Sequence, residues 1–168
     1  MNDIWPLNSL AHMRRKEKHM NDPAAIAAVL HSADVLHLGM CDDGWPYVTP
    51  VNFVYDDGVI LIHSARKGRK MEILRRNDRV CIQVETDTAL VEPASPDNAC
   101  QYTMRFKSVI GFGQAVIHTD IPTLTRGLAA LMARYSSRPF RFPDAILDNT
   151  AIIAVRLEAV TGKQDGWG

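Results

Sequence analysis

Short apolar runs, many of them alternating with polar residues, fill most of the chain after residue 34 and predict a protein built mainly of β-strands. Two Asp-Gly pairs, Asp43-Gly44 and Asp57-Gly58, separate the first three strands, and such pairs between apolar runs are typical of tight β-hairpins. Gly111 and Gly113 indicate a bend or bulge in a later strand. Six strands are expected, over residues 35–41, 46–55, 59–64, 79–85, 101–118 and 150–160.

Helical spacing of apolar residues predicts three helices around these strands, over residues 23–32, over residues 68–76, and from about residue 120 onward. The first has Asp22 as its N-cap and a proline in its first turn, and the second ends at Asn77, which tolerates a left-handed C-cap. Residues 87–100 contain prolines and polar residues and are expected to form a long loop. The pattern favours a small antiparallel barrel with flanking helices.

Length and composition fit one domain over residues 1–168, with an N-terminal arm over residues 1–20. Nineteen basic residues balance nineteen acidic ones, which disfavours a general nucleic-acid or membrane-surface binder. No apolar run reaches the ~20 residues that span a bilayer, and the N-terminus lacks the pattern of a secretion signal. Cys41 and Cys81 lie in strand-like runs and are expected to be buried thiols in a reducing compartment. We therefore expect a cytoplasmic protein.

The most distinctive chemistry lies between the strand over residues 59–64 and the helix over residues 68–76. The strand ends at Ser64, and the helix begins after Gly68 with Arg69 and Lys70. Cations at a helix N-terminus are unfavourable by a few tenths of a kcal/mol each, because that end carries partial positive charge. An anion bound there by free backbone N–H groups, the hydroxyl and the basic side chains removes this cost. The order of strand, serine hydroxyl, glycine, basic pair and helix therefore favours a phosphate-bearing ligand. Charge alone is equally consistent with a solvated basic turn.

Three segments together resemble a known family. They are residues 46–53 (Pro-Tyr-Val-Thr-Pro-Val-Asn-Phe), residues 63–65 with 68–70 (His-Ser-Ala, Gly-Arg-Lys), and residues 108–113 (Ser-Val-Ile-Gly-Phe-Gly). The chain resembles the flavin-binding split-barrel proteins related to pyridoxamine 5′-phosphate oxidase, and especially the FMN-binding branch that includes nitroimidazole-resistance proteins. The resemblance implies a six-stranded antiparallel split β-barrel, a homodimer with flavin at the interface, and FMN as the cofactor. It also implies an FMN-dependent oxidoreductase acting on a small molecule, for which a nitroimidazole or another nitroaromatic is one candidate.

The same resemblance implies a set of cofactor-binding residues. Arg69 and Lys70 match the phosphate-binding Arg-Lys pair of the family, and Ser64 matches a hydroxyl residue near the phosphate. Apart from the resemblance, Lys67 is a further candidate for phosphate binding because of its place in the basic turn, where it could also be simply solvated. The segment whose backbone amides run along the isoalloxazine ring corresponds to Thr49, Pro50, Val51, Asn52 and Phe53. Its asparagine is also a possible side-chain donor to the ring.

His63 matches a histidine that faces the flavin in the nitroimidazole-resistance branch. Because imidazole titrates near neutral pH, His63 could contact the cofactor or donate a proton to the reduced substrate, and it is the candidate catalytic residue. The alternative is a strand histidine that only packs locally. The six histidines show no ligand spacing, so no metal site is expected.

Several alternatives stay open. The chain end, residues 161–168, lacks the arginine- and histidine-bearing motif with which the oxidase binds pyridoxal phosphate, so vitamin B6 oxidation is not expected. A non-catalytic flavin carrier or redox sensor, or a binder of another phosphorylated cofactor, would share the phosphate motif. Trp5, Trp45 and Trp167 could stack on a ring, although Trp45 follows a turn and is more typical of a packing residue. Nucleic-acid binding through residues 66–76 is the weakest hypothesis, because aromatic residues are not interleaved with the basic ones.

Overall fold

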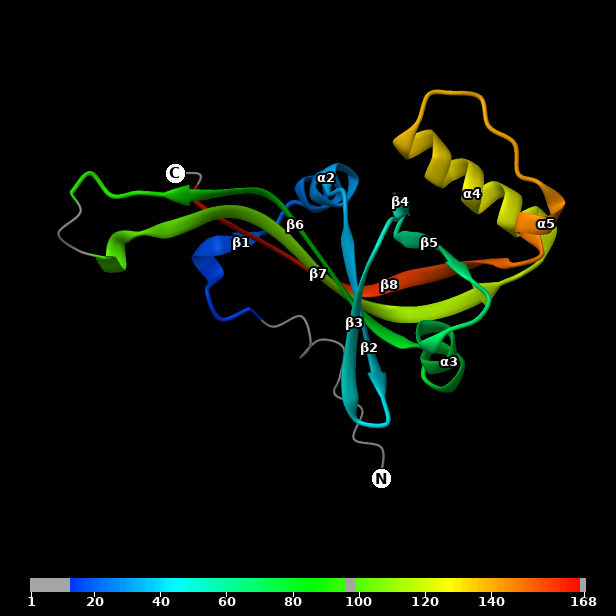
Figure 1. Cartoon of the computed structure of the whole chain (residues 1–168). Coiled ribbons are helices and arrows are strands. Elements are labelled where there is room, and N and C mark those ends of the chain that lie inside the picture. Colours follow the sequence, from blue (N-terminus) through cyan, green and yellow to red (C-terminus); the bar gives the residue numbers. More distant parts are fainter. Residues whose placement is uncertain (1–12, 96–98, 167–168) are drawn as a thin grey trace.

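The computed structural model describes residues 13–95 and 99–166, which form one sheet with helices around it (Figure 1). The strands are β1 (His19–Met20), β2 (Leu36–Asp42), β3 (Trp45–Val51), β4 (Val54–Asp56), β5 (Val59–Ala65), β6 (Arg79–Val91), β7 (Thr103–His118) and β8 (Thr150–Asp165). The α-helices are α2 (Pro23–Ser32), α3 (Arg69–Arg76), α4 (Ile121–Tyr135) and α5 (Asp144–Leu147). Two 3₁₀ turns complete the elements, η1 (Lys16–Lys18) and η2 (Ala99–Gln101). The prediction of a mainly β fold with flanking helices is confirmed.

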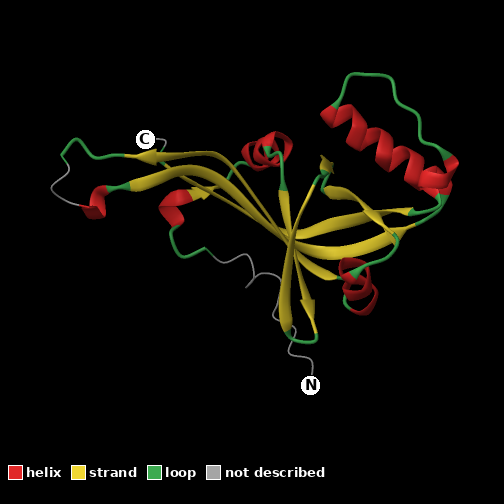
Figure 2. Ribbon diagram, viewed as in Figure 1, coloured by secondary structure: helices red, strands yellow, loops and turns green. Residues whose placement is uncertain are grey.

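The sheet is antiparallel throughout and follows the order β3-β2-β6-β7-β8-β5-β4, with β1 paired to β8. The two ends of this path, β3 and β4, are consecutive in the chain and are joined only by Asn52 and Phe53. The sheet therefore curls until its two edges approach each other, as a split barrel requires (Figure 2). We call residues 52–53 the seam, because they join the two ends of the sheet.

Local backbone geometry explains the turns and the bend. In the hairpin turns, Asp43 and Gly44 have φ of 51° and 83°, and Asp57 and Gly58 have φ of 40° and 82°. Positive φ at both central residues matches the twist of the flanking strands. The register of β7 against β8 shifts at Gly113, where a Cβ atom would stand 2.0 Å from a backbone carbonyl oxygen of β8. The predicted bulge is confirmed.

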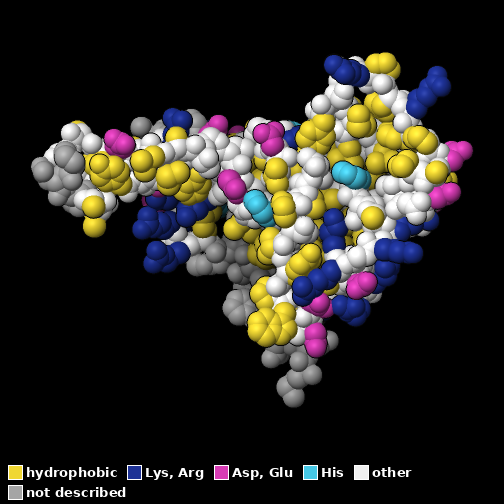
Figure 3. All heavy atoms as spheres, viewed as in Figure 1, with side chains coloured by type: hydrophobic (Ala, Val, Ile, Leu, Met, Phe, Trp, Pro, Cys, Tyr) yellow, Lys and Arg dark blue, Asp and Glu magenta, His cyan; other side chains and the backbone are white. Residues whose placement is uncertain are grey.

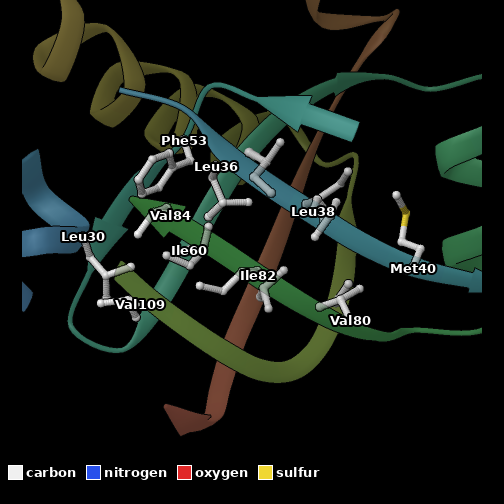
Figure 4. Packing of buried hydrophobic residues seen from close by; sticks show 14 of the residues in the cluster. Leu30, Leu36, Leu38, Met40, Phe53, Ile60, Val80, Ile82, Val84 and Val109 are labelled. Carbon is white, nitrogen blue, oxygen red and sulfur yellow. The ribbon is translucent and has the colours of Figure 1, made fainter. Parts of the chain in front are cut away.

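Two apolar clusters hold the fold together. The larger fills the barrel and includes Leu36, Leu38, Phe53, Ile60, Ile82 and Val109 (Figure 4). The smaller lies under α4 and contains Leu124, Leu131, Leu147 and Ile152. Each fully buried aliphatic side chain contributes about 1.5–3 kcal/mol relative to exposure. Helix α4 is therefore part of the stable fold, and it can hold the residues that it contacts in a fixed position.

Several strand boundaries differ from the prediction. The strand expected over residues 46–55 breaks at the seam, because Phe53 turns its side chain fully into the core. Together with the short β1, this break gives eight strands among the described residues instead of six. The first part of the loop expected over residues 87–100 is wrong, since β6 continues to Val91, which pairs with Thr103 of β7. Strands β6, β7 and the end of β8 project from the barrel as a ribbon, along which hydrophobic side chains are visible in Figure 3.

Three single-residue predictions are also wrong. Asn77 has φ of −144°, so α3 ends in an extended conformation and not in a left-handed cap. Cys41 is exposed, because it lies next to the turn on the outer face of the sheet. Trp45 is 75% exposed and does not pack on the body. Trp5 and Trp167 lie outside the described residues. Within the described part of the chain, no helix has the length and apolar character needed to cross a membrane.

Candidate functional site

The basic residues singled out from the sequence lie where β5 leads into α3. Gly68 is the N-cap of α3 and has φ of 110°, a conformation that L side chains rarely adopt. Within residues 13–95 and 99–166, no side chain caps the helix, so the N–H groups of its first turn have no side-chain acceptor there. Lys and Arg side chains gather around α3 (Figure 3). We call His63, Ser64, Lys67, Arg69 and Lys70 the basic corner.

Arg69 is tied to the hairpin of β2 and β3. Its guanidinium lies 3.6 Å from a carboxylate oxygen of Asp42 and 4.6 Å from the centre of the Tyr47 ring. The same carboxylate also accepts a hydrogen bond from Arg76. The Arg69 side chain is 59% exposed, and exposed ion pairs contribute only about 0.2–1 kcal/mol. A ligand phosphate can therefore compete with Asp42 for this guanidinium.

Lys70 and His63 are two residues of the basic corner whose positive charge is not balanced by an ion pair within the described part of the chain. Lys70 is half-buried, has no ion pair among the described residues, and its pKa is lowered by desolvation. The pKa of His63 is also lowered, mainly by desolvation although the residue is partly exposed, and further by the positive charge of Lys70. Both shifts mean that positive charge is unfavourable here in the absence of an anion. A bound anion would offset both effects.

The other basic residues of this region differ in their availability. The Arg66 guanidinium donates to the backbone carbonyls of Thr150, Thr119 and Leu147 at 2.9, 3.2 and 3.1 Å, so its role is structural. Arg75 donates to the Arg66 carbonyl at 2.8 Å. Lys67 is exposed, and it forms no ion pair within the part of the chain that the structure describes. Ser64 is half-buried on β5.

Residues 49–53, expected to run beside a flavin ring, offer fewer backbone donors than the sequence suggested. Strand β3 is an edge strand paired only with β2, and the two-residue turn makes Asp42 and Trp45 a hydrogen-bonded pair. Since such pairs alternate, the amides of Thr49 and Val51 also face β2. Pro50 has no N–H, and the N–H of Phe53 donates to the Tyr135 hydroxyl at 3.2 Å.

Asn52 is the residue of this segment whose hydrogen-bond donors are still available to a ligand. It is exposed, and neither its backbone N–H nor its side-chain amide has a hydrogen-bond partner among the described residues. Strand β4 pairs with β5 so that Val54 lies opposite Leu61. Continuing this register by two residues brings the chain at Asn52 toward His63. On this register the seam lies next to the basic corner, and the stacking of Arg69 on Tyr47 joins the corner to β3, the strand that leads into the seam.

A family model described as pyridoxamine 5′-phosphate oxidase matches residues 22–164, which is most of the chain. The chain belongs to the pyridoxamine 5′-phosphate oxidase family. No curated protein matches the sequence. Members of this family share the split-barrel arrangement that the strand order and the seam display.

Several solved structures are similar to this member of the oxidase family. A proposed 5-nitroimidazole antibiotic resistance protein from Bacteroides thetaiotaomicron is 30% identical, with a TM-score of 0.76 over 86% of this chain and 85% of that one. The flavocytochrome Anf3 from Azotobacter vinelandii is 21% identical, with a TM-score of 0.82 over 95% of this chain and 75% of that one. An FAD and heme binding protein from Mycobacterium smegmatis is 18% identical, with a TM-score of 0.77 over 89% and 75%. The last two similarities concern the fold alone.

Reasoning from the sequence missed three residues of this site. Asp42 and Tyr47 fix Arg69 through the β2–β3 hairpin, and Tyr135 binds the seam from a position 82 residues further along the chain. The turn next to Asp42 could have suggested a partner for a basic side chain, but no sequence signal links Tyr135 to Phe53. No group of three or more potential metal ligands occurs in the described ranges.

Proposed function

We propose that this protein is an FMN-binding flavoprotein whose basic corner binds the phosphate. The observation that carries the proposal is the half-buried Lys70, which forms no ion pair with the described residues and lies beside the uncapped start of α3. Desolvation and the positive charge of Lys70 lower the pKa of the neighbouring His63. A phosphate fits this donor set because it accepts from the free N–H groups and from Ser64 while neutralising the lysine. Lys67 adds an exposed cation, and Arg69 adds a planar guanidinium.

Residues 49–53 suit the ring end of the same ligand. Asn52 supplies a backbone N–H and a side-chain amide, Pro50 is also exposed, and Thr49 and Val51 are half-buried. Phe53 is fully buried, so it holds the segment in place and offers no surface to the ligand. FMN, when bound, would supply the redox chemistry. His63, on the β5 side of the seam, is the group that would hold a proton close to the ring.

We also propose that two copies form a homodimer, which closes the flavin site from the other side. On the outer face of β3, β2, β6 and β7, the charged residues Arg79 and Glu85 flank a central uncharged stretch of β6, Cys81 and Gln83. Val48 and Ile110 are 59% and 40% exposed on the same face. The Nδ1 atom of His37 is buried on this face and has no hydrogen-bond partner among the residues that the structure describes. An obligate dimer of this kind buries about 2,000 Å² or more. Light scattering tests it, and a monomer mass for the flavin-loaded protein would contradict it.

The activity that we propose is FMN-dependent reduction of a small molecule. A nitroaromatic is the candidate substrate, since the relative that is 30% identical is a proposed 5-nitroimidazole antibiotic resistance protein. A non-catalytic carrier would use the same phosphate site. A different phosphorylated cofactor is the second candidate, because the basic corner does not recognise the ring, and an F420 reductase is 28% identical with a TM-score of 0.53.

Two measurements separate these functions. The purified protein should be yellow, and denaturation should release a flavin whose mass identifies it as FMN. The loaded protein should then turn over an electron donor with a nitro compound or a quinone. Flavin binding without turnover would leave the carrier function, and the absence of flavin binding would contradict the proposal.

A further inference from the structure

The seam is held by a residue that the flavin site does not otherwise involve. The Tyr135 hydroxyl, at the end of α4, lies 3.2 Å from the Phe53 nitrogen, 3.1 Å from the Phe53 carbonyl oxygen and 3.3 Å from the Asp34 carbonyl oxygen. A phenol has one proton, so it accepts from the Phe53 N–H and donates to one of the two carbonyls at a time. A single hydroxyl thus fixes both peptide groups of Phe53.

The neighbouring Arg134 adds further contacts that hold Phe53 in place. Its guanidinium donates to the carbonyl oxygens of His31, at 2.7 Å, and of Ala33, at the C-terminal end of α2. It also lies 5.0 Å from the centre of the Phe53 ring, which is fully buried. Cations are favourable at a helix C-terminus, where backbone carbonyls lack partners. The end of α4 therefore joins α2 and the seam, at the point where the two edges of the sheet meet.

We propose that Tyr135 is a positioning residue for the flavin ring, acting through the backbone of the seam. This inference rests on the proposed function, because it assigns the ring end of the ligand to residues 49–53. Asn52 is directly attached to Phe53, whose N–H and C=O are both fixed by the hydroxyl. The hydroxyl therefore fixes the peptide group between Asn52 and Phe53, and with it the backbone position from which the side-chain amide of Asn52 extends.

The variant Tyr135→Phe tests this proposal, because it removes the hydroxyl and keeps the ring. FMN and riboflavin should both bind about three- to tenfold more weakly, as expected for one hydrogen bond. The ratio of the two affinities should not change, since the basic corner is untouched. Tyr55→Phe is the matched control, because Tyr55 is half-buried and its hydroxyl has no hydrogen-bond partner in the described ranges. This control should bind both ligands like the wild type.

A double-mutant cycle with Asn52→Ala distinguishes positioning from a general loss of stability. If Tyr135 acts through Asn52, the second substitution should have little further effect on flavin affinity once the first is present. Independent effects that multiply, or wild-type affinity for both flavins in Tyr135→Phe, would overturn the proposal. A wild-type protein that binds no flavin would instead contradict the proposed function, so the two failures are distinguishable.

Discussion

The basic corner and the seam adjoin in space but are built by different physical means. Residues of the corner lie within eight positions of one another, from His63 to Lys70, and act through charge, desolvation and an uncapped helix start. The seam is shaped by packing of Phe53 and by the hydroxyl of Tyr135, which is 82 residues away. One region is local in sequence, and the other depends on the finished fold.

Because the two regions are built differently, they contribute differently to ligand binding. Charges at the corner recognise a phosphate whatever ring it carries, and salt weakens such interactions when they are exposed. The seam offers one uncommitted donor residue, Asn52, whose direction depends on surrounding packing. Changes at the corner should therefore alter the preference for FMN over riboflavin, and changes at the seam should affect both equally. Variants that remove one group at a time test whether the two regions contribute separately to binding.

The largest effect is expected where the two regions meet, at His63. His63→Ala should retain FMN but lower turnover per bound flavin by about 10²-fold, the scale of one general acid. Since the protonated form is the donor, the wild-type rate should fall as pH rises through the pKa of His63. The measurement is turnover normalised to flavin occupancy between about pH 5.5 and 8.5. An unchanged normalised rate and pH profile would assign His63 to packing or cofactor contact.

Removal of the corner's half-buried charge should have the next largest effect. Lys70→Ala should weaken FMN binding by roughly ten- to a hundredfold, because a charge-assisted contact is lost, and should leave riboflavin binding unchanged. Arg69→Ala should cost less, because Arg69 gives up its pairing with Asp42 and its stacking on Tyr47 to reach the ligand. Lys67→Ala should cost the least of the three, because Lys67 is exposed and its attraction to the phosphate is screened by solvent. Titration of each variant with both flavins checks the order, and equal losses for FMN and riboflavin would contradict it.

A smaller effect is expected at the seam. Asn52→Ala should weaken FMN and riboflavin alike by about two- to tenfold, the value of one or two neutral hydrogen bonds. The same two titrations measure it. A loss confined to FMN would mean that Asn52 serves the phosphate and that the two regions are not separate.

The smallest effect concerns the stability of the ligand-free protein. The pKa of His63 lies below its ordinary value of 6.5 in the folded state, so the unfolded chain takes up this proton more readily. Stability should therefore decrease as pH falls below about 6.5 and level off below the folded pKa. Denaturant unfolding of the wild type and of His63→Gln at several pH values measures this, and the variant should lack that part of the decrease. Identical pH dependence in both proteins would show that His63 is not desolvated.

The parts of the fold that the sequence predicts well are those decided by neighbouring residues. Asp22 and Pro23 start α2, the two Asp-Gly pairs form the hairpins, and Gly68 precedes the basic helix. In contrast, the structural role of Arg66 depends on carbonyls more than 50 residues away, and the break of the strand over residues 46–55 depends on the burial of Phe53. Tertiary contacts alone decide which hydrogen-bond partners these residues have. The local sequence pattern therefore overestimated the number of hydrogen-bond donors that the site offers to a ligand.

Comparison of FMN with riboflavin on the wild-type protein tests the central claim most directly, because the two ligands differ only in the phosphate. Titration of the flavin-free protein, followed by flavin fluorescence at low and at moderate salt, gives both dissociation constants. The basic corner predicts that FMN binds at least about tenfold more tightly, with the advantage shrinking as salt increases. Equal affinity for the two flavins at both salt concentrations would contradict the assignment of the phosphate to Lys70 and Arg69.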